Sequence, residues 1–161
     1  MIRKYDLLKD DTVVVNGTML YRIKALYAFG NVEAEDLGGY IAIEANLSHC
    51  GEAWVFEAAM VYDDARIYDN ALVYGKAIIH GDAEIYDNAR VFENADIFCH
   101  SEVYGRAKIF GDARVYGHAK VLGNVQVYGS SWITGNHEIA GNVHIKSNTV
   151  CFKRLFGGLN S

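Results

Sequence analysis

The chain of 161 residues has no proline, only three cysteines and no apolar run of the ~18 residues that a membrane-spanning helix needs. Cys50, Cys99 and Cys151 are odd in number and lack the spacing of a metal site, so we expect reduced thiols. The amino end has no apolar stretch before a cleavage site, which argues against a secretory signal. Because the net charge is −5, general binding to nucleic acid is disfavoured as well. These absences favour a cytoplasmic protein that does not associate with membranes.

A six-residue repeat runs without insertion from Gly51 to Phe152, which makes seventeen units. Units such as DNALVY and GDAEIY begin with Gly or Asp. They carry Ala at the third position and Ile or Val at the fifth. The third and fifth positions face the same side of a strand because side chains alternate along it. Each unit is therefore expected to be a short strand with an inward small–large pair, followed by a tight bend. The bends account for the 16 glycines, because glycine adopts turn conformations easily. The strands account for the absence of proline, because proline has no backbone N–H to donate to a neighbouring strand.

Three units would close a triangle, so one turn should take 18 residues and the repeat should make between five and six turns. At about 4.8 Å per turn the column would be roughly 27 Å long. An aliphatic residue followed four positions later by a small one resembles the hexapeptide motif of left-handed parallel β-helices. The resemblance implies an all-β, left-handed parallel β-helix, and a right-handed repeat is the alternative.

The first fifty residues do not follow the repeat. The segment from Val13 to Tyr21 alternates around Asn16-Gly17, which predicts a β-hairpin. We expect residues 1–50 to form a cap with an irregular first turn, residues 51–152 the β-helix, and residues 153–161 a tail whose Leu155 and Phe156 cover the other end. The amino-terminal region resembles the YdcK-like hexapeptide proteins of bacteria and phages. The matching segments are FGNV at 29–32, LGGY at 37–40, NLS at 46–48 and GEAWV at 51–55.

The fourth and sixth positions of each unit should point outward, and residues 18 apart should stack in columns. On the first of three faces both positions are often apolar, which is unusual for a solvated surface. We therefore expect a homo-oligomer that packs through this face, and the family resemblance implies a trimer. The expected interface residues are Met60, Tyr62, Ile78, Phe98, Tyr116 and Trp132. Stacking between neighbouring strands is the alternative role for the aromatic members of this set.

The third face combines aromatic and basic side chains. Rings for stacking and cations for phosphate are what a nucleotide-like ligand requires. The candidate ligand-binding residues are Arg90, Phe92, Lys108, Phe110, Tyr128, His144 and Lys146. The alternative is a solvated charged face that pairs with the second face of a neighbouring subunit, through Glu84, Glu102 and Glu138.

Catalysis and metal binding have weaker support in the sequence. The best-known proteins of this fold are acyltransferases, and the resemblance implies a histidine base and a loop extruded from one turn. No such loop interrupts the repeat. His100 and His118 lie 18 residues apart and should stack on one corner, so they are the candidate metal ligands, but a third ligand is missing. We predict no cofactor.

The sequence thus favours a non-catalytic, cytoplasmic scaffold in a bacterial cell, encoded by the bacterium or by a phage. We expect it to capture a small anionic, nucleotide-like ligand on its outer face or at a subunit junction. A structural or protein-interaction module is the first alternative, and an acyltransferase of the hexapeptide class is the second.

Overall fold

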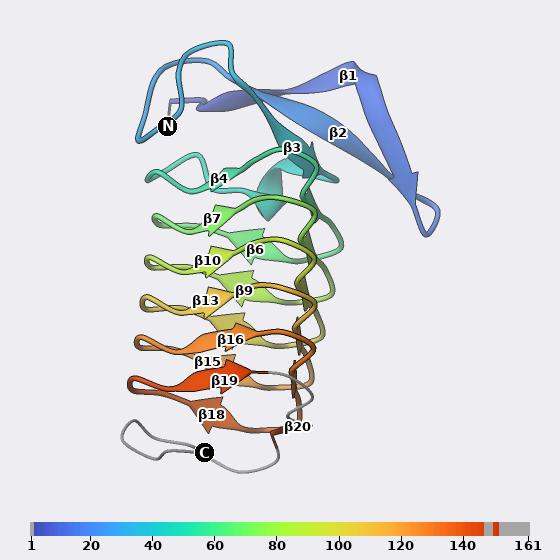
Figure 1. Cartoon of the computed structure of the whole chain (residues 1–161). Coiled ribbons are helices and arrows are strands. Elements are labelled where there is room, and N and C mark those ends of the chain that lie inside the picture. The colour runs from blue at the N-terminus through green and yellow to red at the C-terminus, as the bar shows by residue number, and fades with distance from the viewer. Residues whose placement is uncertain (1, 147–149, 152–161) are drawn as a thin grey trace.

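The computed structural model describes residues 2–146 and 150–151, and Figure 1 shows its architecture. Short parallel strands wind into a column of about six turns, and an antiparallel hairpin extends from its amino-terminal end. Within the described ranges the one helical element is the 3-10 turn η1 (Glu44–Asn46). The expected all-β parallel solenoid with an amino-terminal hairpin is confirmed.

Three parallel sheets form the sides of the column. The first contains β5 (Met60–Val61), β8 (Ile78–Ile79), β11 (Asp96–Ile97), β14 (Arg114–Val115), β17 (Trp132–Ile133) and β20 (Val150–Cys151). The second contains β6 (Arg66–Ile67), β9 (Glu84–Ile85), β12 (Glu102–Val103), β15 (Lys120–Val121) and β18 (Glu138–Ile139). The third contains β4 (Trp54–Val55), β7 (Leu72–Val73), β10 (Arg90–Val91), β13 (Lys108–Ile109), β16 (Gln126–Tyr128) and β19 (His144–Lys146). Three further strands continue the first sheet beyond β5: β1 (Tyr5–Val15), β2 (Thr18–Ala25) and β3 (Leu37–Ile41).

The register of the sheets follows directly from the repeat. Each solenoid strand begins six residues after the previous one, from β4 to β20, with no insertion. Arg90 pairs with Lys108, and Lys108 pairs with Gln126, so strands one turn apart lie side by side. The three sheets therefore carry the three outer faces that the sequence predicts.

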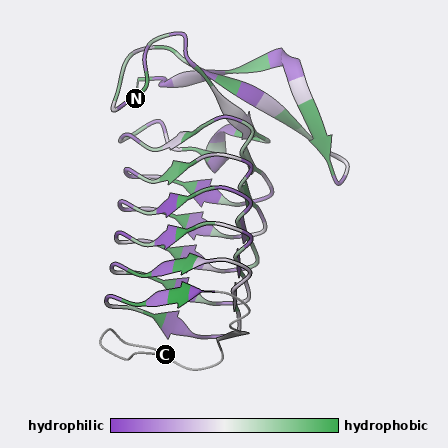
Figure 2. Ribbon diagram, in the orientation of Figure 1, coloured by the Kyte–Doolittle hydropathy of each residue, from purple (hydrophilic) through white to green (hydrophobic). Residues whose placement is uncertain are grey.

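Small and aliphatic side chains fill the interior of the column. Ala89 and Val91, at the third and fifth positions of one unit, are both fully buried, and the same pattern recurs from turn to turn. Where Ser101 replaces the alanine, its hydroxyl donates to the carbonyl oxygen of Phe98 at 2.8 Å, which satisfies the buried polar group. Hydrophilic turns project from one edge of the column (Figure 2).

The first position of each unit forms the corner of the triangle and takes a left-handed backbone conformation. Glycine adopts it most easily, yet acidic residues occur there too, such as Asp63 with φ 56° and Asp87 with φ 55°. The Asp63 carboxylate accepts a hydrogen bond from the N–H of Gly81 one turn later at 3.1 Å, and Asp87 does the same for Gly105 at 3.0 Å. These bonds offset the cost of the strained backbone and link neighbouring turns.

The hairpin strands β1 and β2 pair in antiparallel fashion and turn at Asn16 and Gly17, whose φ angles of 50° and 81° suit a two-residue turn. A register shift lies between Leu8 and Thr12 of β1. At this region the hairpin bends, and its outer half runs down beside the column (Figure 1). The outer end of β1 is the apolar segment coloured green in Figure 2.

This outer half of the hairpin packs on the upper part of the first face. Leu20 of the hairpin, Tyr40 of β3 and Tyr62 form one buried cluster, against which Met60 and Ile78 also pack. Tyr62 is only 5% exposed. The expectation of an open apolar strip along the whole first face is therefore wrong at its upper end, because the chain's own hairpin covers it.

The remaining expectations concern the ends of the chain. Residues 37–47 form the irregular first turn, since β3 pairs in parallel with β5 and Leu47 bridges to Ile67. The tail at 153–161, with Leu155 and Phe156, lies outside the described residues. No helix in the described part of the chain combines the length and apolar character needed to span a membrane.

Candidate functional site

Aromatic rings at the sixth position stack on one another along all three faces. On the third face Tyr74, Phe92, Phe110 and Tyr128 lie 4.8–4.9 Å apart between ring centroids, with interplanar angles of 1–3°. Phe98 and Tyr116 stack in the same way on the first face, at 4.9 Å. The faces of the inner rings are thus covered by their neighbours, which stabilises adjacent turns and leaves those faces unavailable to a ligand.

A second set of contacts joins the sixth position of one unit to the fourth position of the unit below. The Tyr68 hydroxyl donates to Glu84 at 2.8 Å, and the Tyr86 hydroxyl donates to Glu102 at 2.9 Å. Burial, together with the acceptor carboxylate, raises the pKa of both tyrosines. Glu84 and Glu102 therefore have partners within the chain. Sequence reasoning missed these pairs, although their constant separation of 16 residues is visible in the repeat.

The predicted ligand residues of the third face separate into two columns. Phe92, Phe110 and Tyr128 belong to the ring stack at the sixth position. Arg90 and Lys108 lie side by side at the fourth position. His144 and Lys146 belong to β19, two turns further down, and both are exposed. Arg90 and Lys108 line one concave site together.

That site is a groove along the corner beside the third face. Its lower section has a volume of about 330 Å³ and is lined by Asn88, Arg90, Arg106 and Lys108. Its upper section has a volume of about 260 Å³ and shares Asn88 and Arg90 with the lower one. The other residues of the upper section are Gly30, Asn31, Val32, Glu52, Phe56, Asn70 and Leu72. For a ligand site, sequence reasoning considered only the fourth and sixth positions, so it missed Asn88 and Arg106, which both occupy the second.

Positive charge is concentrated in the lower section of this groove. Arg90 lies close enough to the Tyr74 hydroxyl to act on its pKa. Arg106 and Lys108 form no ion pair with any carboxylate among the described residues, whereas Lys120 on the second face pairs with Glu102 at 3.5 Å. Three cations on adjacent turns repel one another, so an anion bound between them would be stabilised. We name this site the basic groove, and define its cations as Arg90, Arg106 and Lys108.

The metal candidates do not form a coordination site. The rings of His100 and His118 stack at 4.8 Å with an interplanar angle of 13°. Lone pairs of stacked rings lie in parallel planes, so they do not converge on one ion. His100 Nδ1 lies 3.2 Å from an Asp82 oxygen instead. Among the described residues, no group of three or more His, Cys, Asp or Glu side chains could hold a metal ion.

The first face keeps an exposed apolar part below the hairpin. Trp132 is 43% exposed, and the Arg114 guanidinium lies over its ring at 5.7 Å. A groove of about 630 Å³ also runs beside the hairpin, with Val13, Met60 and Ile78 among its lining residues. The expected interface residues thus divide into a group that contacts the hairpin and a group, Phe98, Tyr116 and Trp132, that lies below it.

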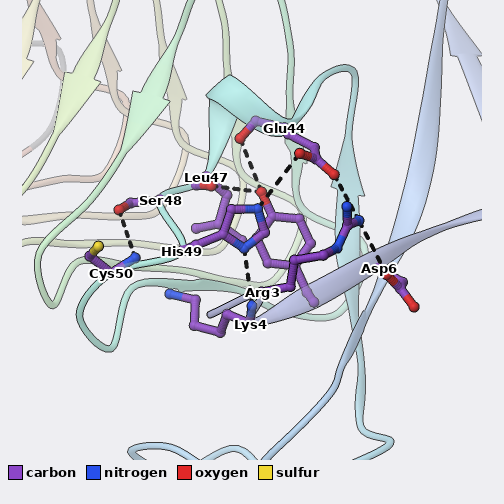
Figure 3. Close-up of polar contacts among 9 residues, drawn as sticks. Arg3, Lys4, Asp6, Glu44, Leu47, Ser48, His49 and Cys50 are labelled. Atoms are coloured by element: carbon purple, nitrogen blue, oxygen red, sulfur yellow. Dashed lines mark hydrogen bonds and ion pairs between the residues drawn. The ribbon is translucent and has the colours of Figure 1, made fainter. Parts of the chain in front are cut away.

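A further polar cluster that sequence reasoning missed lies inside the cap (Figure 3). The fully buried Lys4 ammonium donates to the carbonyl oxygen of Ala53 at 2.8 Å and to that of Gly51 at 3.3 Å. The Tyr5 hydroxyl donates to the carbonyl oxygens of Leu47 and Glu44 at 2.6 and 3.0 Å. These bonds attach the start of β1 to the irregular first turn.

Comparison with known proteins agrees with this architecture. A family model described as the YdcK beta solenoid repeat matches residues 65–81, which cover strands β6 to β8 up to the corner at Gly81. None of the curated proteins has a sequence that matches the chain. The repeat match and the six turns of solenoid together support a YdcK-like β-helix protein.

Proposed function

Because the chain is a YdcK-like β-helix protein with a cationic groove on its surface, we propose that it is a non-catalytic scaffold that captures a small anionic, nucleotide-like ligand. The observation that carries the proposal is the basic groove, in which Arg106 and Lys108 have no ion-pair partner among the described residues. Phosphate oxygens are the acceptors that such a cluster of guanidinium and ammonium groups favours.

The upper section of the groove supports a nucleotide-like ligand over a simple anion. Phe56 and Leu72 provide an apolar wall, and the amides of Asn70 and Asn88 can both donate and accept hydrogen bonds. A base could lie against this wall while its phosphate contacts the cations below. The two sections together have the size of an ordinary small-molecule site.

Absence of catalysis is part of the proposal, and the regularity of the chain supports it. Strands follow one another every six residues from Trp54 to Lys146, so no turn carries an extruded loop. The acyltransferase alternative predicts turnover of acetyl-CoA with an acceptor. Release of free thiol from CoA thioesters by the purified protein would favour that alternative and contradict the non-catalytic assignment.

The ligand assignment is tested by thermal unfolding in the presence of mononucleotides, cyclic dinucleotides and inorganic phosphate. A bound nucleotide should raise the melting temperature in proportion to the logarithm of its concentration. Arg106→Ala should abolish this rise without changing the melting temperature of the free protein. Arg114→Ala, a cation of the first face, is the matched control and should keep the rise. A panel that produces no shift with the unaltered protein would refute the assignment.

A second candidate role is self-assembly through the first face into a homotrimer, and the exposed Trp132 beside Arg114 is the observation that favours it. Trp132→Asp should reduce the mass measured by light scattering to that of one chain. Ile78→Asp is a less clear test because Ile78 packs against the hairpin cluster. An unchanged mass for Trp132→Asp would exclude this part of the face as an interface.

A further inference from the structure

A cavity of about 390 Å³ lies where the cap meets the second face, at the start of the solenoid. It is separate from the basic groove and shares no lining residue with it. Its walls come from the first irregular turn and from the residues of β6 and just after it. They are formed by Glu44, Ala45, Leu47, Ser48, His49, Arg66, Ile67 and Tyr68.

The cavity exists because an aromatic stack ends there. Tyr68, Tyr86 and Tyr104 stack at 4.9 and 4.8 Å on the second face, and Tyr86 is the single described ring that stacks on Tyr68. One turn above, the chain places Ser48, whose N–H donates to the carbonyl oxygen of Ile67. A small side chain thus occupies the place that an aromatic ring takes in the turns below. The outer face of Tyr68 borders the cavity and can accept a flat ring.

His49 provides a buried donor in the wall of this cavity. Its Nδ1 accepts the backbone N–H of Lys4 at 3.1 Å, and its ring stacks on Tyr5 at 4.3 Å. An accepting Nδ1 places the proton of the neutral ring on Nε2. Burial lowers the pKa of His49, which keeps the ring neutral. The side chain is only 9% exposed, yet Nε2 has no hydrogen-bond partner within the described structure.

The Glu44 carboxylate faces this donor from the other side. Arg3 pairs with Glu44 Oε1 at 2.7 Å, whereas Oε2 lies 3.8 Å from His49 Nε2, too far for a direct hydrogen bond (Figure 3). One hydroxyl group can bridge the two atoms, because its oxygen accepts from Nε2–H while its proton is donated to Oε2. One donor and one acceptor therefore suit a hydroxyl, which can do both, better than a group that can only accept hydrogen bonds.

We propose that this cavity is a binding site for a small aromatic ligand that carries a ring hydroxyl. The ring continues the tyrosine stack on the outer face of Tyr68, beside the exposed Ala45. The hydroxyl lies between His49 and Glu44. The exposed Arg66 guanidinium, which has no ion pair among the described residues, contacts an anionic substituent at the open side.

Isothermal titration calorimetry with three related probes tests this assignment. 4-Hydroxybenzoate has the ring, the hydroxyl and the anionic group, whereas benzoate lacks the hydroxyl and trans-4-hydroxycyclohexanecarboxylate lacks the flat ring. We expect 4-hydroxybenzoate to bind and each of the other two to bind at least about tenfold more weakly. Equal affinity for benzoate, or no binding of 4-hydroxybenzoate because the cavity takes only water, would overturn the proposal.

Two pairs of variants locate the site. Tyr68 and Tyr104 are the two ends of one stack, but only Tyr68 lines the cavity. Tyr68→Leu should abolish binding, and Tyr104→Leu should retain it. Glu44→Leu should weaken binding about tenfold or more, while Glu35→Leu, which also removes an ion pair of the cap, should not.

The outcomes of these pairs do not depend on the basic groove. If Tyr68→Leu and Tyr104→Leu reduce affinity equally, the ligand does not lie on Tyr68 and the assignment fails. Circular dichroism at the temperature of the titration establishes that each variant is folded. Arg106→Ala should leave 4-hydroxybenzoate binding unchanged, so failure of the nucleotide proposal and failure of this one are distinguishable.

Discussion

At the scale of single residues, the most unusual group in the chain is the buried ammonium of Lys4. It donates to two carbonyl oxygens and lies 5.0 Å from the centre of the Phe29 ring. Burial lowers its pKa from the ordinary 10.5 to about 8, because desolvation penalises the charged form. The protein thus accepts the cost of a buried charge in order to attach the start of β1 to the first turn.

This pKa shift predicts a pH dependence of stability. Between about pH 8 and pH 10 the unfolded chain keeps the Lys4 proton while the folded chain releases it, so the free energy of unfolding should rise with pH. The rise should approach about 1.4 kcal/mol per pH unit within this window. Urea unfolding of the unaltered protein and of Lys4→Met measures it. Parallel pH curves for the two proteins would contradict the prediction.

The hydroxyl groups of the tyrosine stack provide a second prediction. Tyr86→Phe removes a hydrogen bond to the Glu102 carboxylate and should lower the free energy of unfolding by about 1 kcal/mol. Tyr104→Phe is the control, because the Tyr104 hydroxyl has no hydrogen bond among the described residues. Chemical unfolding of both variants provides the comparison. Equal losses would show that the Tyr86 bond contributes nothing to stability.

At the scale of the structural element, the backbone conformation at each corner restricts which residues can occupy the first position of the repeat. Gly105 has a φ of 68°, and a Cβ atom there would lie 2.8 Å from the backbone nitrogen of Gly123. Gly105→Ala should therefore destabilise the protein by about 1–3 kcal/mol. Gly105→Asp should cost less, because its carboxylate can accept the Gly123 N–H as Asp87 does for Gly105. Thermal unfolding compares the two variants, and a larger loss for Asp would refute this account of the corner.

Much of the element-scale structure could be predicted because the repeat is local and periodic. The inward alanine and aliphatic positions, the stacked columns and the hairpin around Asn16-Gly17 all follow from residues close in sequence. Contacts between distant segments without a period could not be predicted. The bent hairpin buries Tyr62, and the cap buries Trp54 beside Phe29, although both residues occupy outward positions of the repeat.

The candidate sites show the same limit. Arg90 and Lys108 were predicted together because one turn separates them. The cavity beside His49 was not predicted, since it requires an irregular first turn whose path depends on buried Tyr5 and Asn46 contacts. Within the repeat, the local sequence pattern determines where each side chain lies. In the cap, the packing of residues distant in sequence determines it.

At the scale of the whole molecule, each turn contacts mainly its neighbours, so turns should be removable as units. Deletion of residues 105–122 removes one complete turn and keeps every column in register. We expect a folded protein with an unchanged far-ultraviolet circular dichroism per residue and a lower melting temperature. Deletion of residues 106–122 shifts the later chain by one position and should prevent cooperative unfolding, because inward and outward side chains exchange. Equal stability of the two deletion variants would contradict the view that the solenoid is built from removable turns of 18 residues.

The hydrogen bonds of the corner carboxylates all run in one direction along the chain, and this direction has a consequence for the order in which the turns fold. Asp63, Asp87 and Glu93 each accept an N–H from the residue one turn later in the chain. A ribosome releases the amino end first, so a finished turn presents these acceptors before the next turn exists. If the turns fold in the order of synthesis, we expect each new turn to meet a surface that already holds hydrogen-bond acceptors in the correct register. We therefore expect the carboxylates that relieve strain in the folded protein also to orient each following turn as the chain folds.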